Sequence, residues 1–190
     1  ITTDRISAFD RVLCTIPFKG QVLNQTSAFW FEKTKNIIKN HLIDVLDPNV
    51  MVVKECKPYP VEMVMRGYIT GVTTTSAWYN YERGIRNFCG NILPERLEKN
   101  QKFEKPIITP STKAEHGAHD ESISGKEIIK KGLVDEKIYK KMEKAALALF
   151  DFGAKLVAKN NLILVDTKYE FGELDNELVL IDEIHTPDSS

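Results

Sequence analysis

Two apolar runs near the end of the chain constrain the fold more than any other feature. They read LILVDTKYEFGELDNELVLIDE over residues 162–183. Apolar, β-branched runs on either side of a turn-forming stretch are typical of a β-hairpin, so we expect two antiparallel strands joined by the five residues GELDN. The runs are too apolar for an exposed hairpin, which indicates that one face is buried.

Charged side chains stand at alternate positions in the first run. Side chains of a strand alternate between its faces, so we expect Asp166, Lys168 and Glu170 on one face. A symmetric loop would place Asp182 opposite Asp166, although a slip of one residue would reverse this. Carboxylates beside a lysine suit Mg²⁺, which binds through one or two carboxylates and substrate phosphates. The alternative is a solvated hairpin face with a surface ion pair, and the residues alone leave both interpretations open.

Composition excludes several classes of protein. The 190 residues suffice for one domain or two small lobes, and a net charge of −1 argues against a dedicated nucleic-acid-binding protein. We find no apolar stretch of membrane-spanning length and no signal peptide, so we expect no membrane partner. Cys14, Cys56 and Cys89 form no CxxC or Cys/His cluster. We therefore expect buried free thiols in a cytoplasmic protein.

The chain mixes helical and strand patterns without strict βαβ alternation, which favours an α+β fold. We expect a helix after an N-cap at Thr26 or Ser27, a long helix over residues 135–159, and strands over 50–55 and 61–70. Pro58 stands between these strands and predicts a boundary between lobes. Residues 91–124 are polar and proline-punctuated, and we expect a long functional loop there. Both ends read as if a longer chain continued beyond them.

Three other segments carry polar residues, each with an ordinary structural alternative. TDRISAFD, residues 3–10, could be a simple turn. MRGYITGVTTTS, residues 65–76, could hold a phosphate through Arg66 and the hydroxyls that follow it. STKAEHGAHDES, residues 111–122, is better interpreted as a mobile substrate loop than as a zinc site. We find no GxSxG, Walker A or paired cysteine nucleophile, so covalent catalysis by a side chain is not indicated.

Taken in order, seven segments resemble the SAICAR synthetase (phosphoribosylaminoimidazole-succinocarboxamide synthase) family. They are TDRISAFD, KGQVLNQTSAFWF, VEMVMRGYITG, RNFCGN, TPSTKAEHGAHDESIS, LVDTKYEFG and LIDEIHTPDSS. The resemblance implies an α+β fold of two lobes around an ATP cleft, similar to ATP-grasp enzymes and kinases. Residues 1–57 would be the remainder of the N-terminal ATP-binding lobe, and residues 58–190 the C-terminal lobe. The family's glycine-rich strands would precede residue 1, and a phosphate-contacting arginine would follow PDSS.

The resemblance also implies a reaction and its residues. The family joins L-aspartate to the carboxylate of an aminoimidazole ribonucleotide (CAIR) with ATP and Mg²⁺, in purine biosynthesis. Mg²⁺ would be held by Glu170 and Asp182, and the catalytic residues would be Asp166 and Lys168. The substrate-binding residues would be Asp4, Arg5, Ser7, Asp10, Arg66, Lys113, His119 and Asp120. ATP would bind at Lys57, Pro58 and Glu62.

Two departures from the family pattern and two rival functions accompany this assignment. Val72 stands where the family usually has serine, so Thr73 or Thr74 would supply the phosphate-binding hydroxyl. Ala118 removes one carboxylate from the loop that commonly reads GEHDE. One rival is an ATP-using kinase or ligase with another acceptor. The other is a non-catalytic nucleotide-binding subunit, which would be expected to have lost residues such as Lys168. The oligomeric state stays open.

Overall fold

A computed structural model describes residues 1–8, 11–113 and 121–190 of the chain. Its centre is a five-stranded antiparallel sheet of order β11-β10-β5-β8, in which β9 also pairs with β5. The strands are β5 (Lys57–Tyr68), β8 (Lys102–Ile108), β9 (Ser111–Thr112), β10 (Asp166–Leu174) and β11 (Glu177–Ile181). Helices combined with an antiparallel sheet confirm the predicted α+β class.

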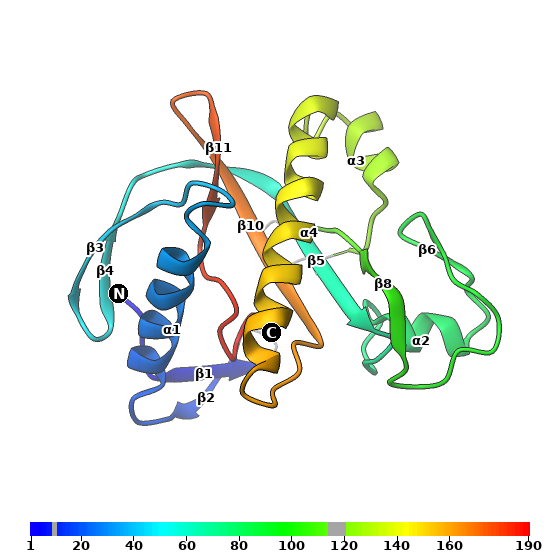
Figure 1. The fold of residues 1–190 in the computed structure, drawn as a ribbon, viewed down its shortest axis with the longest axis horizontal. Coiled ribbons are helices and arrows are strands. Elements are labelled where there is room, and N and C mark those ends of the chain that lie inside the picture. Colours follow the sequence, from blue (N-terminus) through cyan, green and yellow to red (C-terminus); the bar gives the residue numbers. More distant parts are fainter. Residues whose placement is uncertain (9–10, 114–120) are drawn as a thin grey trace.

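Helices and small two-stranded sheets surround this central sheet. The helices are α1 (Lys19–Thr34), α2 (Ala77–Glu82), α3 (Gly125–Lys130) and α4 (Glu136–Ala158). The small sheets pair β1 (Arg5–Ala8) with β2 (Arg11–Thr15), β3 (Leu42–Asp47) with β4 (Val50–Val53), and β6 (Asn87–Phe88) with β7 (Asn91–Ile92). α1 and the β1–β2 pair lie on one side of α4, and α2 lies on the other (Figure 1).

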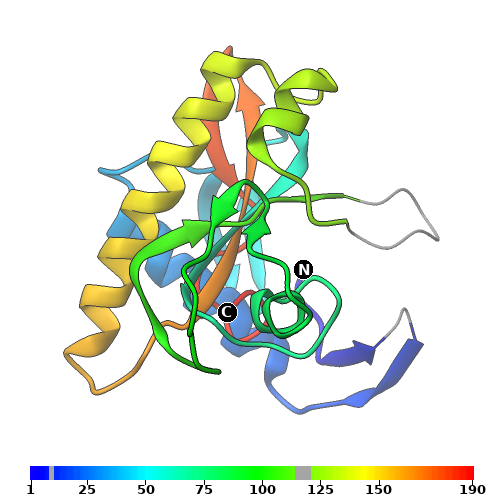
Figure 2. The same cartoon turned by 90° about the vertical axis from the view of Figure 1, so that its right-hand side faces the viewer.

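The central sheet has one apolar face, which α4 covers (Figure 2). Met63 and Met65 of β5 and Tyr169 and Phe171 of β10 stand at every second position of their strands and are fully buried in one cluster with Leu149 of α4. Burying each such side chain is worth about 1.5–3 kcal/mol. Because α4 fixes this face inward, the intervening side chains of β5 and β10 must point to the other face. We call that other face the polar face.

The hairpin of β10 and β11 turns more tightly than the sequence suggested. Leu174 pairs with Glu177, so the connection is the two residues Asp175 and Asn176, with φ values of 52° and 61°. Asn and Asp tolerate positive φ, which suits a two-residue hairpin turn. The predicted five-residue GELDN loop is therefore wrong. It follows that the predicted pairing of Asp166 with Asp182 is wrong as well.

Helix α1 begins at Lys19, well before the predicted N-cap at Thr26 or Ser27, so that prediction is wrong. The preceding Phe18 has a φ of 68° and offers no side-chain cap. A distant carboxylate replaces the cap, because the two oxygens of Asp4 accept the backbone N–H groups of Phe18 at 3.2 Å and Gly20 at 2.9 Å. An N-cap supplied from another segment leaves no local signal for sequence analysis to find.

The long helix is confirmed as α4, whose N-cap Asp135 accepts the N–H of Lys137 at 2.8 Å. The expected long loop over residues 91–124 is only partly a loop. It contains β8, which pairs Met65 with Ile108 along the edge of the sheet, and also β7 and β9. β5 begins at Lys57, earlier than the predicted strand.

Cys14, Cys56 and Cys89 carry free thiols, as expected. Their predicted burial is wrong, because Cys14 is exposed and the other two are half-buried. Within the described ranges, no helix combines the length and the apolar character needed to cross a membrane.

A buried histidine, in the segment that follows β11, packs against Tyr169 on the apolar face of the sheet. His185 is 7% exposed, and its Nε2 lies 2.6 Å from the hydroxyl of Tyr169. The ring of Trp30 packs edge-on against it at 4.6 Å, and Gly153 leaves room for the imidazole where a Cβ would clash. Burial lowers the pKa of His185 to about 4, so the imidazole is neutral at pH 7.

This histidine predicts a loss of stability in acid. Its unfolded pKa is 6.5, so between pH 6.5 and 4 the unfolded state binds more protons, and stability falls as the pH falls. The loss should approach roughly 3 kcal/mol at pH 4. His185→Gln should flatten this slope, and urea unfolding at pH 7 and pH 4.5 measures it. His41, whose pKa burial also lowers, should leave a residual slope. Equal slopes in both proteins would contradict the assignment.

Candidate functional site

The polar face carries the charged residues that the sequence places at alternate positions. On β10, Lys168 and Glu170 share this face, and their side chains meet at 3.4 Å. In the register with β5, Asp166 lies opposite Arg66, and Glu170 lies opposite Glu62. Directly paired residues point to the same face. The predicted common face is therefore confirmed, and β5 adds one arginine and one glutamate to it.

Lys168 lies at the centre of this face. Its Nζ donates to Glu62 Oε1 at 2.9 Å and to Glu170 Oε1 at 3.4 Å. Burial alone would lower the pKa of Lys168, but the hydrogen bond and charge of Glu62, with the charges of Glu170 and Asp182, raise it above its ordinary value. Lys168 is therefore a fixed ammonium group at any physiological pH.

Glu170 and Asp182 form the carboxylate end of the same group. Glu170 is 7% exposed, and its Oε2 accepts from the ammonium of Lys113. Burial and the negative charge of Glu183 raise the pKa of Asp182, against the lowering effects of Lys168, Lys113 and a side-chain hydrogen bond to Glu170. The two carboxylates are thus neighbours although no strand register pairs them. We call Glu62, Lys113, Lys168, Glu170 and Asp182 the charged cluster.

The cluster fits a metal ion that arrives with phosphate. In the described ranges, no group of three or more His, Cys, Asp or Glu side chains is placed to hold a metal. Mg²⁺ typically takes one or two carboxylates and completes its shell with phosphate oxygens and water. Glu170 and Asp182 supply that number, so they suit a Mg²⁺–nucleotide better than a free ion. Lys113 would have to release Glu170 before a metal could bind there.

Arg66 marks the other end of the polar face. It is 9% exposed, and its Nε donates to Thr109 Oγ1 at 2.8 Å, while a terminal nitrogen donates to the Thr75 carbonyl at 2.9 Å. Its nearest carboxylate in the described part is Asp166, at 3.4 Å. Burial lowers the pKa of Arg66, and the charge of Asp166 opposes that shift. A buried guanidinium whose other partners are neutral groups, with one counter-ion at 3.4 Å, is suited to an anionic ligand.

The hydroxyl-rich turn after β5 lies next to this arginine, since Thr75 is its hydrogen-bond acceptor. Thr73 Oγ1 lies 2.7 Å from Ser76 Oγ, and the Thr73 N–H donates to the same Ser76 oxygen at 3.2 Å. Val72, where the resemblance leads us to expect serine, is 71% exposed. The turn keeps donors beside Arg66 although that serine is missing.

The other predicted site residues lie at several places. Asp4 caps α1, whereas Arg5 and Ser7 lie on the exposed strand β1. Lys57 and Pro58 are at the start of β5. Glu62, which is predicted to bind ATP together with these two, lies in the charged cluster beside Lys168. Three predicted residues fall outside the described part of the chain: Asp10, His119 and Asp120.

Sequence reasoning missed two polar residues of this face. Ser111 on β9 donates to Glu62 Oε2 at 3.3 Å, and Thr109 accepts from Arg66. Both lie in the stretch that was expected to be a loop. In the sequence these two residues appear only as hydroxyl side chains at positions 109 and 111. That spacing predicts a shared face only once β8 and β9 are known to pair with β5.

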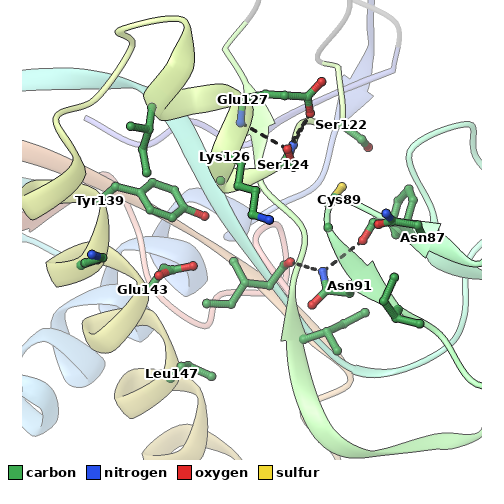
Figure 3. A pocket seen from close by; sticks show the side chains of 18 of the residues that line it. Asn87, Cys89, Asn91, Ser122, Ser124, Lys126, Glu127, Tyr139, Glu143 and Leu147 are labelled. Atoms are coloured by element: carbon green, nitrogen blue, oxygen red, sulfur yellow. Dashed lines mark hydrogen bonds between the residues drawn. The ribbon is translucent and has the colours of Figure 1, made fainter.

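A large cavity of about 1160 Å³ lies away from the charged cluster, between α3, α4, β8 and the β6–β7 pair (Figure 3). Cys89 lines it, and burial raises the pKa of its thiol to about 11, against the charge of Arg66. The thiol is therefore protonated at neutral pH and is a poor nucleophile. Tyr139, on the opposite wall, also has its pKa raised by burial. The Cys89 thiol and the Tyr139 hydroxyl are thus both protonated at neutral pH.

The antiparallel sheet has a helix on one face and partly buried charged side chains on the other. This arrangement defines an α+β protein with a candidate site for a polar ligand. Comparison with known proteins gives the particular family. The chain belongs to the SAICAR synthetase family, which matches residues 1–190.

Two curated relatives illustrate the match, and each is named phosphoribosylaminoimidazole-succinocarboxamide synthase. The chloroplastic protein of Vigna aconitifolia is 52% identical over the whole of this chain, which covers 55% of that protein. The protein of Legionella pneumophila (strain Lens) is also 52% identical, and the chain covers 61% of it. The chain therefore spans a little over half the length of these relatives.

Solved structures agree with the fold. SAICAR synthase from Saccharomyces cerevisiae, complexed with SAICAR, superposes with a TM-score of 0.85 at 34% identity, over 98% of this chain and 67% of the other. A SAICAR synthetase in complex with ADP gives a TM-score of 0.77 at 27% identity, over 96% of this chain and 71% of the other. The predicted SAICAR-synthetase type of fold is confirmed.

Proposed function

We propose that this chain is part of an enzyme that joins L-aspartate to the carboxylate of CAIR, with ATP as the energy source, to give SAICAR, ADP and phosphate. The observation that carries the proposal is the charged cluster, where Lys168 is held between Glu62 and Glu170 with Asp182 beside them. The names of the relatives and the SAICAR and ADP complexes of related proteins support the same reaction.

The chemistry explains why such a cluster is needed. A carboxylate does not react with an amine near neutral pH, because oxide would have to leave. In the proposed route a CAIR carboxylate oxygen attacks the γ-phosphorus of ATP, and the bond to ADP breaks. The aspartate ammonium loses one proton, its nitrogen attacks the acyl carbon, and the C–O bond to phosphate breaks with its electron pair. The nitrogen loses a second proton, so one proton ends on phosphate and the other passes to solvent.

The cluster residues have distinct roles in this proposal. Glu170 and Asp182 would hold Mg²⁺, which when bound offsets the charge of the nucleotide phosphates. The Lys168 ammonium offsets charge on the moving phosphoryl group, and Glu62 keeps that ammonium in place. Asp166 would face the ribonucleotide near Arg66. Lys113 would exchange its contact with Glu170 for a contact with substrate.

The nucleotide end of the proposed site lies at the start of β5. Lys57 and Pro58, at the start of β5, would contact ATP, and a boundary between lobes at Pro58 would form the wall of the ATP cleft. Glu62 belongs functionally with Lys168 rather than with these two residues. We also propose a cytoplasmic location.

Measuring ADP release with CAIR, with and without L-aspartate, tests this function in the full-length protein. The proposal expects release that depends on all three substrates. ADP release that is complete without aspartate would favour a kinase, and nucleotide binding without any release would favour a non-catalytic subunit. Either result would overturn the proposed ligation.

Arg66→Met should weaken binding of the ribonucleotide far more than binding of ATP. The methionine keeps the bulk of the side chain but removes the fork that we aim at the 5′-phosphate, so an affinity loss of about 10- to 100-fold is expected from one to two charge-assisted hydrogen bonds. Titrating each ligand separately is the measurement, with exposed Arg83→Met as the control. Equal losses for both ligands would point to a disturbed sheet instead of a lost phosphate contact.

A further inference from the structure

The segment of residues 182–190 leaves the sheet where β11 ends and then returns to β10. Glu170 pairs with Ile181, the last residue of β11. Further toward the start of β10, the backbone N–H of Lys168 donates to the carbonyl of Ser189 at 3.0 Å. The returning segment thus takes the place of a partner strand beside the residues that carry the charged cluster.

Asp182 begins this segment in an uncommon backbone conformation. Its φ is 64°, and the φ of His185 is 49°. Both values lie in the left-handed region, which is uncommon for residues other than glycine and persists where surrounding contacts hold it. The direction in which the Asp182 carboxylate points therefore depends on the contacts that hold the turn from Asp182 to His185.

These contacts lie on both faces of β10. On the polar face, the side chain of Asp182 is hydrogen-bonded to that of Glu170. On the apolar face, Nε2 of His185 and the hydroxyl oxygen of the fully buried Tyr169 lie 2.6 Å apart. Tyr169 stands between Lys168 and Glu170 in the strand. The contact between His185 and Tyr169 thus ties the turn to the part of β10 that Asp182 meets on the other face.

The surroundings of the imidazole leave it little freedom to move. The ring of Trp30 packs edge-on against it at 4.6 Å, and a Cβ at Gly153 would clash with it. The preceding residue, Ile184, is fully buried, and its N–H donates to Ser27 Oγ at 3.4 Å. A change in the position of His185 would therefore displace the turn that carries Asp182.

Stability alone does not account for this polar pair. Nδ1 of His185 is buried and has no hydrogen-bond partner in the described part of the chain. A buried polar group without a partner costs free energy, whereas two apolar side chains of similar shape can replace a buried hydrogen-bonded pair at little cost. A role in positioning explains why Tyr169 and His185 are polar in this apolar surrounding.

We infer that His185 and Tyr169 are positioning residues that hold the Asp182 carboxylate beside Glu170 for the Mg²⁺–nucleotide, an inference that rests on the function proposed above. Both residues act from the apolar face, through the turn after β11 and the backbone of β10. Residues that orient a metal ligand from behind typically contribute about 10- to 100-fold to metal affinity or activity.

Binding of ADP to the full-length protein tests this role without turnover. Calorimetry gives the Kd for ADP in Mg²⁺ and in EDTA, and the ratio of the two values is the gain in affinity due to the metal. Tyr169→Phe keeps the ring, and it should lower this gain about tenfold while the Kd in EDTA stays within twofold of the wild-type value. Tyr139→Phe removes the hydroxyl of another buried tyrosine, on α4, and should change neither value.

Substitutions of His185 give a second readout. His185→Gln can still offer a hydrogen-bonding group to the Tyr169 hydroxyl, so it should retain most of the gain. His185→Leu fills a similar space without a polar group and should lose the gain as Tyr169→Phe does. Thermal unfolding identifies the variants that are folded. A wild-type gain in folded Tyr169→Phe, or an equal loss of ADP affinity in Mg²⁺ and in EDTA, would overturn the positioning role.

The outcomes of this test are distinct from those that test the proposed function. ADP binding requires neither CAIR nor L-aspartate, so the gain in affinity can be compared among variants whatever the acceptor is. ADP release by the wild type that does not require L-aspartate would overturn the ligation. A wild-type gain in Tyr169→Phe, together with aspartate-dependent turnover, would overturn the positioning role alone.

Discussion

Replacing Lys168 with methionine is expected to lower kcat about 10³-fold or more, the size of effect that a single cation on a transferring phosphoryl group supplies. The ammonium is held between Glu62 and Glu170. Another cation of the described chain could replace it only by forming both of these contacts itself. The KM for L-aspartate should change much less than kcat. Single-turnover ADP formation measures the affected step directly.

The Lys168→Met variant also leaves Glu62 without its partner, and this needs a control for folding. Glu62 is 8% exposed, and removing one member of a buried ion pair can cost about 3–5 kcal/mol of stability. The double variant Lys168→Met with Glu62→Gln should regain stability but no activity. Lys39→Met, which breaks an exposed pair with Glu177, should leave activity unchanged. Recovery of activity in the double variant would contradict a direct role for Lys168.

Glu170→Gln and Asp182→Asn are each expected to lower turnover about 10²–10³-fold, because each removes one charge from the group that faces metal and phosphate. Both substitutions keep the shape of the side chain, so the protein should remain folded. The Mg²⁺ concentration that gives half-maximal rate should rise in both. Turnover measured over a range of Mg²⁺ concentrations tests this, with Mn²⁺ as a second metal.

Glu173→Gln is the matched control for the carboxylate variants. Glu173 lies on the same strand as Glu170, but its carboxylate accepts from the Tyr59 hydroxyl at 3.1 Å, away from Lys168. This variant should keep both its turnover and its Mg²⁺ dependence. Wild-type behaviour of Glu170→Gln or of Asp182→Asn would remove that residue from the metal site.

Local patterns predicted the elements of this fold better than their pairings. The alternation of Asp166, Lys168 and Glu170 was sufficient to place them on one face, because the period of a strand is a local property. The apolar face of α4 was equally visible in its helical spacing. The hairpin register was not visible in the sequence, because it depends on the two-residue turn at Asp175 and Asn176. Both residues adopt positive φ there, a conformation that Asp and Asn tolerate but do not require.

The rest of the site depends on contacts between distant segments. Arg66 lies opposite Asp166, a hundred positions further along the chain, only because β5 pairs with β10. Glu62 joins Lys168 for the same reason. Asp182 contacts Glu170 although it follows the end of β11. Beyond that point the alternation of side chains along a strand no longer predicts where a side chain points. Sequence patterns thus identified the residue types of the site, while the sheet topology decided which of them meet.

The most direct test of the proposed reaction follows the oxygen atoms of CAIR. If ATP phosphorylates the CAIR carboxylate, one carboxylate oxygen must leave with the phosphate when L-aspartate attacks. The full-length protein, given CAIR labelled with ¹⁸O in its carboxylate, should then release inorganic phosphate that carries one ¹⁸O per turnover, as mass spectrometry would show. Phosphate without label, together with a phosphorylated side chain, would contradict this account.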